Sequence, residues 1–151
     1  IIAKTGWTTS NLLDAVAKES IKENSYDMVS LLIGVNNQFQ GLPYTVFQKE
    51  FDELLDLSIL YCKDINAVFV VSIPDYGVTR YGGNNKEGIA KELDTYNAYM
   101  KKQSQALGVV FINVTEVSRA LGASALADDE LHPNADQYAE WVEVIFGVLR
   151  D

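Results

Sequence analysis

The stretch Ala67-Val68-Phe69-Val70-Val71-Ser72-Ile73 is an apolar run of the length of one strand, and Pro74-Asp75 follows it directly. β-Branched and aromatic residues dominate the run, as they do in strands. Its apolar residues are consecutive and do not alternate with polar ones, which is typical of a strand buried on both faces of a parallel sheet. We therefore expect this stretch to lie inside the sheet around which the chain folds.

Strand-like and helix-like segments alternate on both sides of this run. Further strands are predicted at the chain's first residues and in two apolar runs, namely 1–3, 26–33 and 109–114. Apolar residues at helical spacing predict helices between the strands and after them, around 12–21, 47–62, 89–107 and 138–149. This alternation predicts an α/β fold with three layers, α/β/α, in which helices cover both faces of a flavodoxin-like parallel sheet. In such sheets, sites form at the carboxyl ends of the strands.

Composition limits the classes of function. The 151 residues, 48% of them hydrophobic, fit one domain spanning 1–151, and no apolar run approaches the roughly 20 residues of a membrane span. The net charge of −9 argues against nucleic acid or an anionic membrane as partner. The single cysteine, Cys62, and the single histidine disfavour a metal centre, and we expect no metal and no cofactor.

That histidine, His132, lies in the stretch Asp128-Asp129-Glu130-Leu131-His132-Pro133-Asn134. Imidazole is the side chain whose ordinary pKa is closest to physiological pH, so His132 is the candidate general base. Asp129 precedes it by three residues, and in a tight turn its carboxylate reaches one imidazole nitrogen and fixes the tautomer. Pro133 disfavours helical geometry at His132, which predicts a loop. The alternative is a surface turn with a solvated acidic run.

Two further stretches complete a pattern with this one: Gly6 in Lys4-Thr5-Gly6-Trp7, and Gly34-Val35-Asn36-Asn37 after a predicted strand. In order and spacing the three stretches resemble the SGNH hydrolases, also called GDSL esterases and lipases. Gly6 matches the family glycine, Asn36 its asparagine, and Asp129 and His132 its final Asp-x-x-His block. Taken singly, Gly6 reads equally as a turn glycine and Asn36 as a cap at the end of a strand.

The resemblance implies a serine ester hydrolase that cleaves an acyl or acetyl ester in a small molecule or an acylated carbohydrate. In it, His132 takes the serine proton, Asp129 orients His132, and the Gly6 N–H and the Asn36 amide stabilise the oxyanion. Trp7, Tyr76 and Tyr81 are candidate walls of the substrate site, although aromatic residues serve core packing equally well.

The sequence departs from the family pattern in two places. Asn37 stands where the family usually has an aspartate, and we expect this to change a local hydrogen bond without loss of the chemistry. The family's Gly-Asp-Ser block, which carries the nucleophile on the first strand, is absent from the 151 residues. We therefore expect an N-terminally incomplete domain, with a gap beside the strand at 26–33 that an upstream segment or a partner chain fills. The alternative is a non-catalytic ligand-binding module that has lost the nucleophile.

Overall fold

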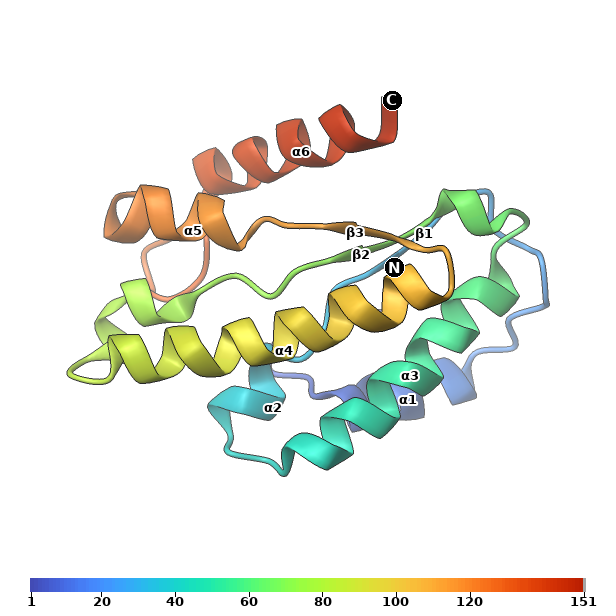
Figure 1. Ribbon diagram of the computed structural model, residues 1–151, viewed down its shortest axis with the longest axis horizontal. Helices are drawn as coiled ribbons and strands as arrows, with labels where there is room; N and C mark the ends of the chain where they lie inside the picture. Colours follow the sequence, from blue (N-terminus) through green and yellow to red (C-terminus); the bar gives the residue numbers. More distant parts are fainter. Residues whose placement is uncertain (151) are drawn as a thin grey trace. The chain divides into compact units, whose positions relative to one another are not determined.

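The computed structural model describes residues 1–150, which form an α/β fold around a three-stranded sheet (Figure 1). The strands are β1 (Val29–Leu31), β2 (Val68–Val71) and β3 (Val110–Ile112), in the order β1-β2-β3. The helices are α1 (Thr9–Lys18), α2 (Val35–Phe39), α3 (Tyr44–Tyr61), α4 (Lys86–Ala106), α5 (Thr115–Leu121) and α6 (Ala135–Arg150). Short 3-10 turns lie at Ile65–Ala67, Tyr76–Val78, Arg80–Gly82 and Gly122–Ala125.

The apolar run at 67–73 forms the middle strand, as the sequence predicts. All four residues of β2 are buried, and β2 pairs with β1 in parallel, with Val29 opposite Val68 and Leu31 opposite Val70. The other neighbour of β2 is β3. The fold class predicted from the alternating segments, a parallel α/β sheet, is therefore confirmed.

The strand predicted at 26–33 is shorter and more exposed than the sequence indicated. Only Val29–Leu31 is strand, Ser30 is exposed, and the flanking Met28 and Leu32 are 58% and 44% exposed. These three side chains share one strand face because they lie at every second residue. The prediction of burial on both faces is thus wrong for β1, because no described residue covers this face.

The first residues differ from the prediction as well. Residues 1–3 form no strand in the structure, and Ile1 is fully exposed. A strand requires a hydrogen-bonded neighbour, and none of the residues 1–150 pairs with residues 1–3 as a strand. Among these residues β1 also has a strand neighbour on one side only, which is β2.

The chain divides into two compact units, of which the first comprises Ile1–Val71 with Ala98–Phe111. Within it α3 packs on β1, and α1 and α2 pack on α3. The buried face of α3 contributes Phe47 and Phe51, whose rings stack with centroids 5.7 Å apart, and Tyr99 of α4 meets both rings edge-on. This aromatic core fixes the position of α3, which carries Glu50.

The second unit comprises Ser72–Asn97 with the chain from Ile112. Its centre is a polar network at the ends of β2 and β3. The buried Ser72 Oγ accepts hydrogen bonds from the N–H groups of Val114 and Thr115, and the Thr115 hydroxyl is hydrogen-bonded 2.9 Å from the Ile73 carbonyl. The side chains thereby satisfy backbone groups where the strands end, as buried backbone groups require.

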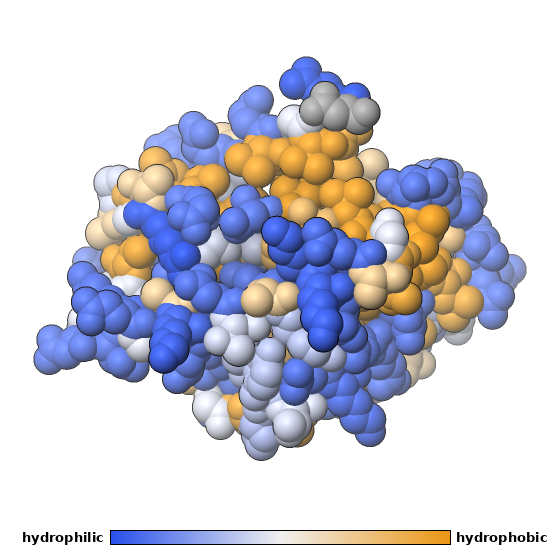
Figure 2. Space-filling view, viewed as in Figure 1, coloured by the Kyte–Doolittle hydropathy of each residue, from blue (hydrophilic) through white to orange (hydrophobic). Residues whose placement is uncertain are grey.

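The surface of α6 is apolar on one side. Tyr138, Val142 and Phe146, at intervals of four residues, are each about half exposed or more. Figure 2 shows apolar surface over this helix. No helix among residues 1–150 combines the length and apolarity that crossing a membrane requires.

Candidate functional site

The loop before α6 brings His132 and Asp129 together. His132 Nδ1 lies 2.6 Å from Asp129 Oδ2, and both side chains are about half exposed. The other carboxylate oxygen, Oδ1, accepts the backbone N–H groups of Leu131 and His132 at 3.0 and 2.9 Å. The predicted reach of the Asp-x-x-His spacing is thus observed, and the aspartate side chain closes the turn.

These hydrogen bonds hold the pKa of Asp129 at about 2, below its ordinary 3.8; the bond from His132 contributes most and the backbone N–H groups add to it. At neutral pH the carboxylate is therefore ionised and can only accept. It follows that His132 Nδ1 carries the proton and donates it to Asp129. Nε2 is then the ring nitrogen left to accept a proton, which is the role of a general base.

Further contacts shape the backbone of this loop. The Ala127 N–H donates to the His132 carbonyl at 2.8 Å, and Leu126 pairs with Pro133 in an antiparallel bridge. Glu130 has a positive φ of 57°, and its carboxylate forms an ion pair with Arg80. Arg80 thus connects the loop that carries His132 to the 3-10 turn at Arg80–Gly82.

In the first unit, Asn36 is hydrogen-bonded to the turn that contains Gly6. Gly6 has a φ of +83°, a conformation open to glycine, and forms a turn in which the Trp7 N–H donates to the Lys4 carbonyl at 3.3 Å. Asn36 Nδ2 donates to the Trp7 carbonyl at 2.9 Å. Since an amide nitrogen carries two hydrogens, this bond fixes the Asn36 side chain and leaves a second N–H to donate.

Gly34-Val35-Asn36-Asn37 follows β1, as the sequence predicted, and it forms the start of α2. Gly34 lies at the N-cap position with φ 118°, and the helix begins at Val35. The Asn37 side chain is fully buried and bonded to Thr9. The partner of the Asn37 side chain is therefore Thr9.

The three aromatic residues predicted to line a substrate site lie in both units. Trp7 is partly buried beside Gly6, and Tyr76 is partly buried at the start of its 3-10 turn. Tyr81 is 45% exposed, and the Arg80 guanidinium lies 5.0 Å from the centre of its ring. Gly6, Trp7 and Asn36 therefore form one group, and Tyr76, Tyr81, Asp129 and His132 belong to the other unit.

Several residues of this site were missed by the sequence analysis. Thr9 and Glu50 support the Gly6 turn, and Arg80 and Arg119 support the loops of the second unit. The two residues in each of these contacts are 28 to 50 residues apart in sequence, so no local spacing could indicate the contacts. Across residues 1–150 there is no cluster of three or more His, Cys, Asp or Glu side chains suited to a metal ion.

Comparison with known proteins adds the family. Residues 1–140 match the model of the GDSL-like lipase/acylhydrolase family. The chain belongs to this family. It is 31% identical over 134 residues to a multidomain esterase of Ruminococcus flavefaciens, a match that covers 86% of this chain and 17% of that protein. The chain thus spans about a sixth of the length of this relative.

Two solved structures share the fold. The acetylxylan esterase Axe2 of Geobacillus stearothermophilus aligns with a TM-score of 0.74 at 18% identity, over 95% of this chain and 68% of that one. LAE5, an α/β hydrolase enzyme from the metagenome of Lake Arreo, aligns with a TM-score of 0.71 at 19% identity over the same shares. Both therefore carry chain beyond the part that matches.

Proposed function

We propose that this chain is part of a serine ester hydrolase in which Asp129 and His132 are two members of a Ser-His-Asp triad. The observation that carries the proposal is the contact of 2.6 Å between His132 Nδ1 and Asp129 Oδ2. It orients the ring, fixes the tautomer and leaves Nε2 as the proton acceptor. The serine is supplied by a segment outside the 151 residues, which contain no Gly-Asp-Ser.

The chemistry proceeds in two acyl transfers. His132 Nε2 takes the serine proton as the serine oxygen attacks the ester carbonyl, and the imidazolium that forms is stabilised by Asp129. The carbonyl oxygen becomes an oxyanion that accepts the Gly6 N–H and the second N–H of Asn36. His132 then returns the proton to the departing alcohol, and water releases the acyl group by the same steps. Each oxyanion donor contributes about 10²–10³-fold to the rate.

The substrate class proposed is a small acyl or acetyl ester, including an acylated carbohydrate. Family membership and the likeness to a multidomain esterase support ester hydrolysis, and a fold neighbour is an acetylxylan esterase. Aromatic side chains suit a sugar ring because they offer flat apolar faces, and Trp7, Tyr76 and Tyr81 are the candidates. The net charge of −9 favours an uncharged ester over an anionic lipid surface.

The test compares two proteins: the 151-residue chain, and an extended protein in which the coding sequence upstream of Ile1 is included. With p-nitrophenyl acetate, we expect turnover by the extended protein and none by the chain alone, because a base without a nucleophile forms no acyl-enzyme. In the extended protein, His132→Ala should remove most of the activity, by orders of magnitude.

The outcomes distinguish an ester hydrolase from a non-catalytic module with the same fold. If the chain alone hydrolyses the ester as fast as the extended protein, a serine within residues 1–151 is the nucleophile and the proposal is wrong. If no upstream Gly-Asp-Ser is encoded and neither protein turns over an ester, the fold serves as a non-catalytic module that binds the acylated ligand.

A further inference from the structure

Asn37 and Thr9 are both fully buried and are joined by two hydrogen bonds. The Thr9 N–H donates to Asn37 Oδ1 at 3.0 Å, and Asn37 Nδ2 donates to Thr9 Oγ1 at 2.6 Å. Since a backbone N–H can only donate, it must face the amide oxygen, and this fixes which way the amide points. The pair thus connects Asn37, which follows Asn36, to Thr9, which lies two residues after Trp7.

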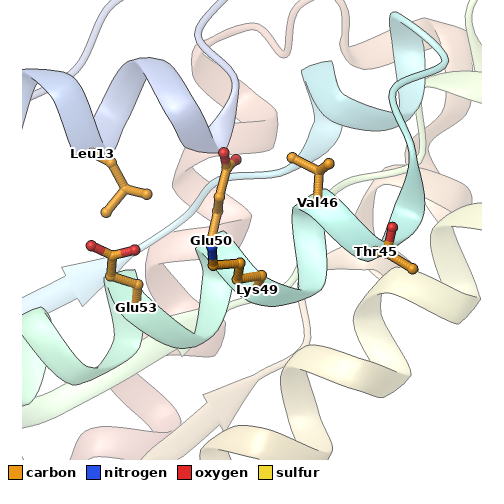
Figure 3. A pocket seen from close by; sticks show the side chains of 6 residues that line it. All are labelled: Leu13, Thr45, Val46, Lys49, Glu50 and Glu53. Atoms are coloured by element: carbon orange, nitrogen blue, oxygen red, sulfur yellow. The ribbon is translucent and has the colours of Figure 1, made fainter.

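The Thr9 hydroxyl is also hydrogen-bonded to a residue of α3. Its oxygen accepts from Asn37, so its single hydrogen is left for Glu50, to which it donates. The Ser10 hydroxyl donates to the other oxygen of the same carboxylate at 2.6 Å. Figure 3 shows Glu50 reaching from α3 toward the start of α1. It lines an open groove with a volume of about 420 Å³, whose other lining residues are Leu13, Thr45, Val46, Lys49 and Glu53.

The direction of each hydrogen bond in this series is therefore determined. Asn37 donates to Thr9, and Thr9 donates to Glu50. An aspartate at position 37 has no hydrogen to give, so the single hydroxyl hydrogen of Thr9 would face two carboxylates. Two carboxylates that share one site raise the pKa of one of them, and the ionised pair repels.

We propose that Asn37 is a positioning residue that presets the Gly6 and Asn36 donors, and that it is an amide because Glu50 takes the hydroxyl hydrogen of Thr9. The inference rests on the proposed function, since Gly6 and Asn36 are oxyanion donors only in an ester hydrolase. Asn37 does not touch the substrate: it acts by holding the turn at 6–9 against the start of α2. Asn36, its neighbour, bonds the same turn through the Trp7 carbonyl.

The experiment measures kcat and KM of the extended protein and its variants with p-nitrophenyl acetate. We expect Asn37→Asp to lower kcat on the order of 10²-fold, as small misplacements of catalytic groups do, with KM little changed. Adding Glu50→Gln should restore most of the loss, because a glutamine amide can donate to Thr9 while Thr9 donates to the aspartate. The matched control is Asn37→Asp with Glu53→Gln, a carboxylate on the same groove with no bond to Thr9, which should restore nothing.

The pH profile distinguishes positioning from a loss of stability. The kcat of Asn37→Asp, divided by the kcat of the parent protein, should rise as pH falls. A proton bound by the two carboxylates at positions 37 and 50 supplies the hydrogen that the asparagine amide donates to Thr9 in the parent protein. With Glu50→Gln added, the ratio should no longer depend on pH. Lys49 and Glu53, the other charged groups on the groove, are unchanged in both proteins.

Two results would overturn the inference: parental kcat in Asn37→Asp, or a loss of activity or folding that Glu50→Gln does not restore. Amide hydrogen exchange at residues 6–9 provides a readout without catalysis, and we expect faster exchange in Asn37→Asp that Glu50→Gln slows again. If the extended protein hydrolyses no ester, the proposed function fails, and this exchange pattern still decides whether the three residues hold the turn.

Discussion

At the scale of single residues, the contact between Asp129 and His132 depends on the negative charge of the Asp129 carboxylate. Titration of that carboxylate tests this dependence. The pKa of Asp129 is lowered to about 2, and the hydrogen bond from His132 is the first cause. A lowered pKa means that the bonds to the carboxylate favour the folded loop at pH values above the ordinary 3.8 and lose that effect as pH falls through about 2.

We therefore predict that the Asp129 carboxyl carbon, followed by NMR, titrates with a midpoint of about 2. In His132→Ala the midpoint should move up toward 3.8, but not reach it, because the backbone N–H groups of residues 131 and 132 still donate to Oδ1. A midpoint near 4 in the parent protein would show that the carboxylate and the imidazole are not bonded in solution.

The residues that sequence reasoning found and those it missed differ in the distance to their partners. Asp129 and His132 are three residues apart, so their contact follows from turn geometry alone. The sequence indicated a local hydrogen bond at Asn37, but its partner Thr9 lies 28 residues away and could not be named. Glu50 gave no signal at all, because a glutamate on a helix is most often solvated.

At the scale of elements, the loop after β2 is tied to α5 by one buried carboxylate. Asp75 is 4% exposed; its Oδ1 accepts the Gly77 N–H at 2.8 Å and its Oδ2 accepts Arg119 Nε at 2.9 Å. Arg119 also reaches Asp94 of α4 at 2.7 Å. The loop that carries Tyr76 and Tyr81 thus begins at a fixed point.

Asp75→Ala should destabilise the protein by about 2–4 kcal/mol, since it removes the buried partner of Arg119 and leaves the buried Gly77 N–H without its acceptor. Urea denaturation of the extended protein measures the change. Glu116→Gln is the matched control, because Glu116 binds the same arginine but its side chain is 68% exposed, and such pairs contribute about 1 kcal/mol or less. Equal effects of the two substitutions would mean that burial of Asp75 does not matter.

The sequence predicted a strand correctly where other residues of the same chain bury it. The apolar run of β2 lies between β1 and β3 and is buried throughout, so its pattern and its environment agree. The run at 26–33 is also mostly apolar, but only three of its residues are strand, and Met28 and Leu32 are exposed. The composition of a strand indicates which side chains need to be buried. It does not indicate whether the residues that bury them belong to the same 151-residue chain.

At the scale of the whole molecule, the family fold and its sheet imply a specific neighbour for β1. Its edge away from β2 meets no strand among residues 1–150, and an apolar strand with an open edge is a template for pairing. We propose that a segment upstream of Ile1 forms the missing strand there. This is the same segment that is proposed to bring the serine, so one addition would complete both the sheet and the triad.

Amide hydrogen exchange tests this directly. In the 151-residue chain, the N–H groups of Val29–Leu31 that point away from β2 should exchange rapidly, whereas in the extended protein they should be protected, because a hydrogen-bonded strand neighbour slows exchange. The matched control is Val68–Val71, which already has strands on both sides and should be protected in both proteins. Equal protection of β1 with and without the upstream residues would mean that another part of the chain, or a second copy of it, closes the edge. Then the nucleophile would have to be sought elsewhere than on a strand added at β1.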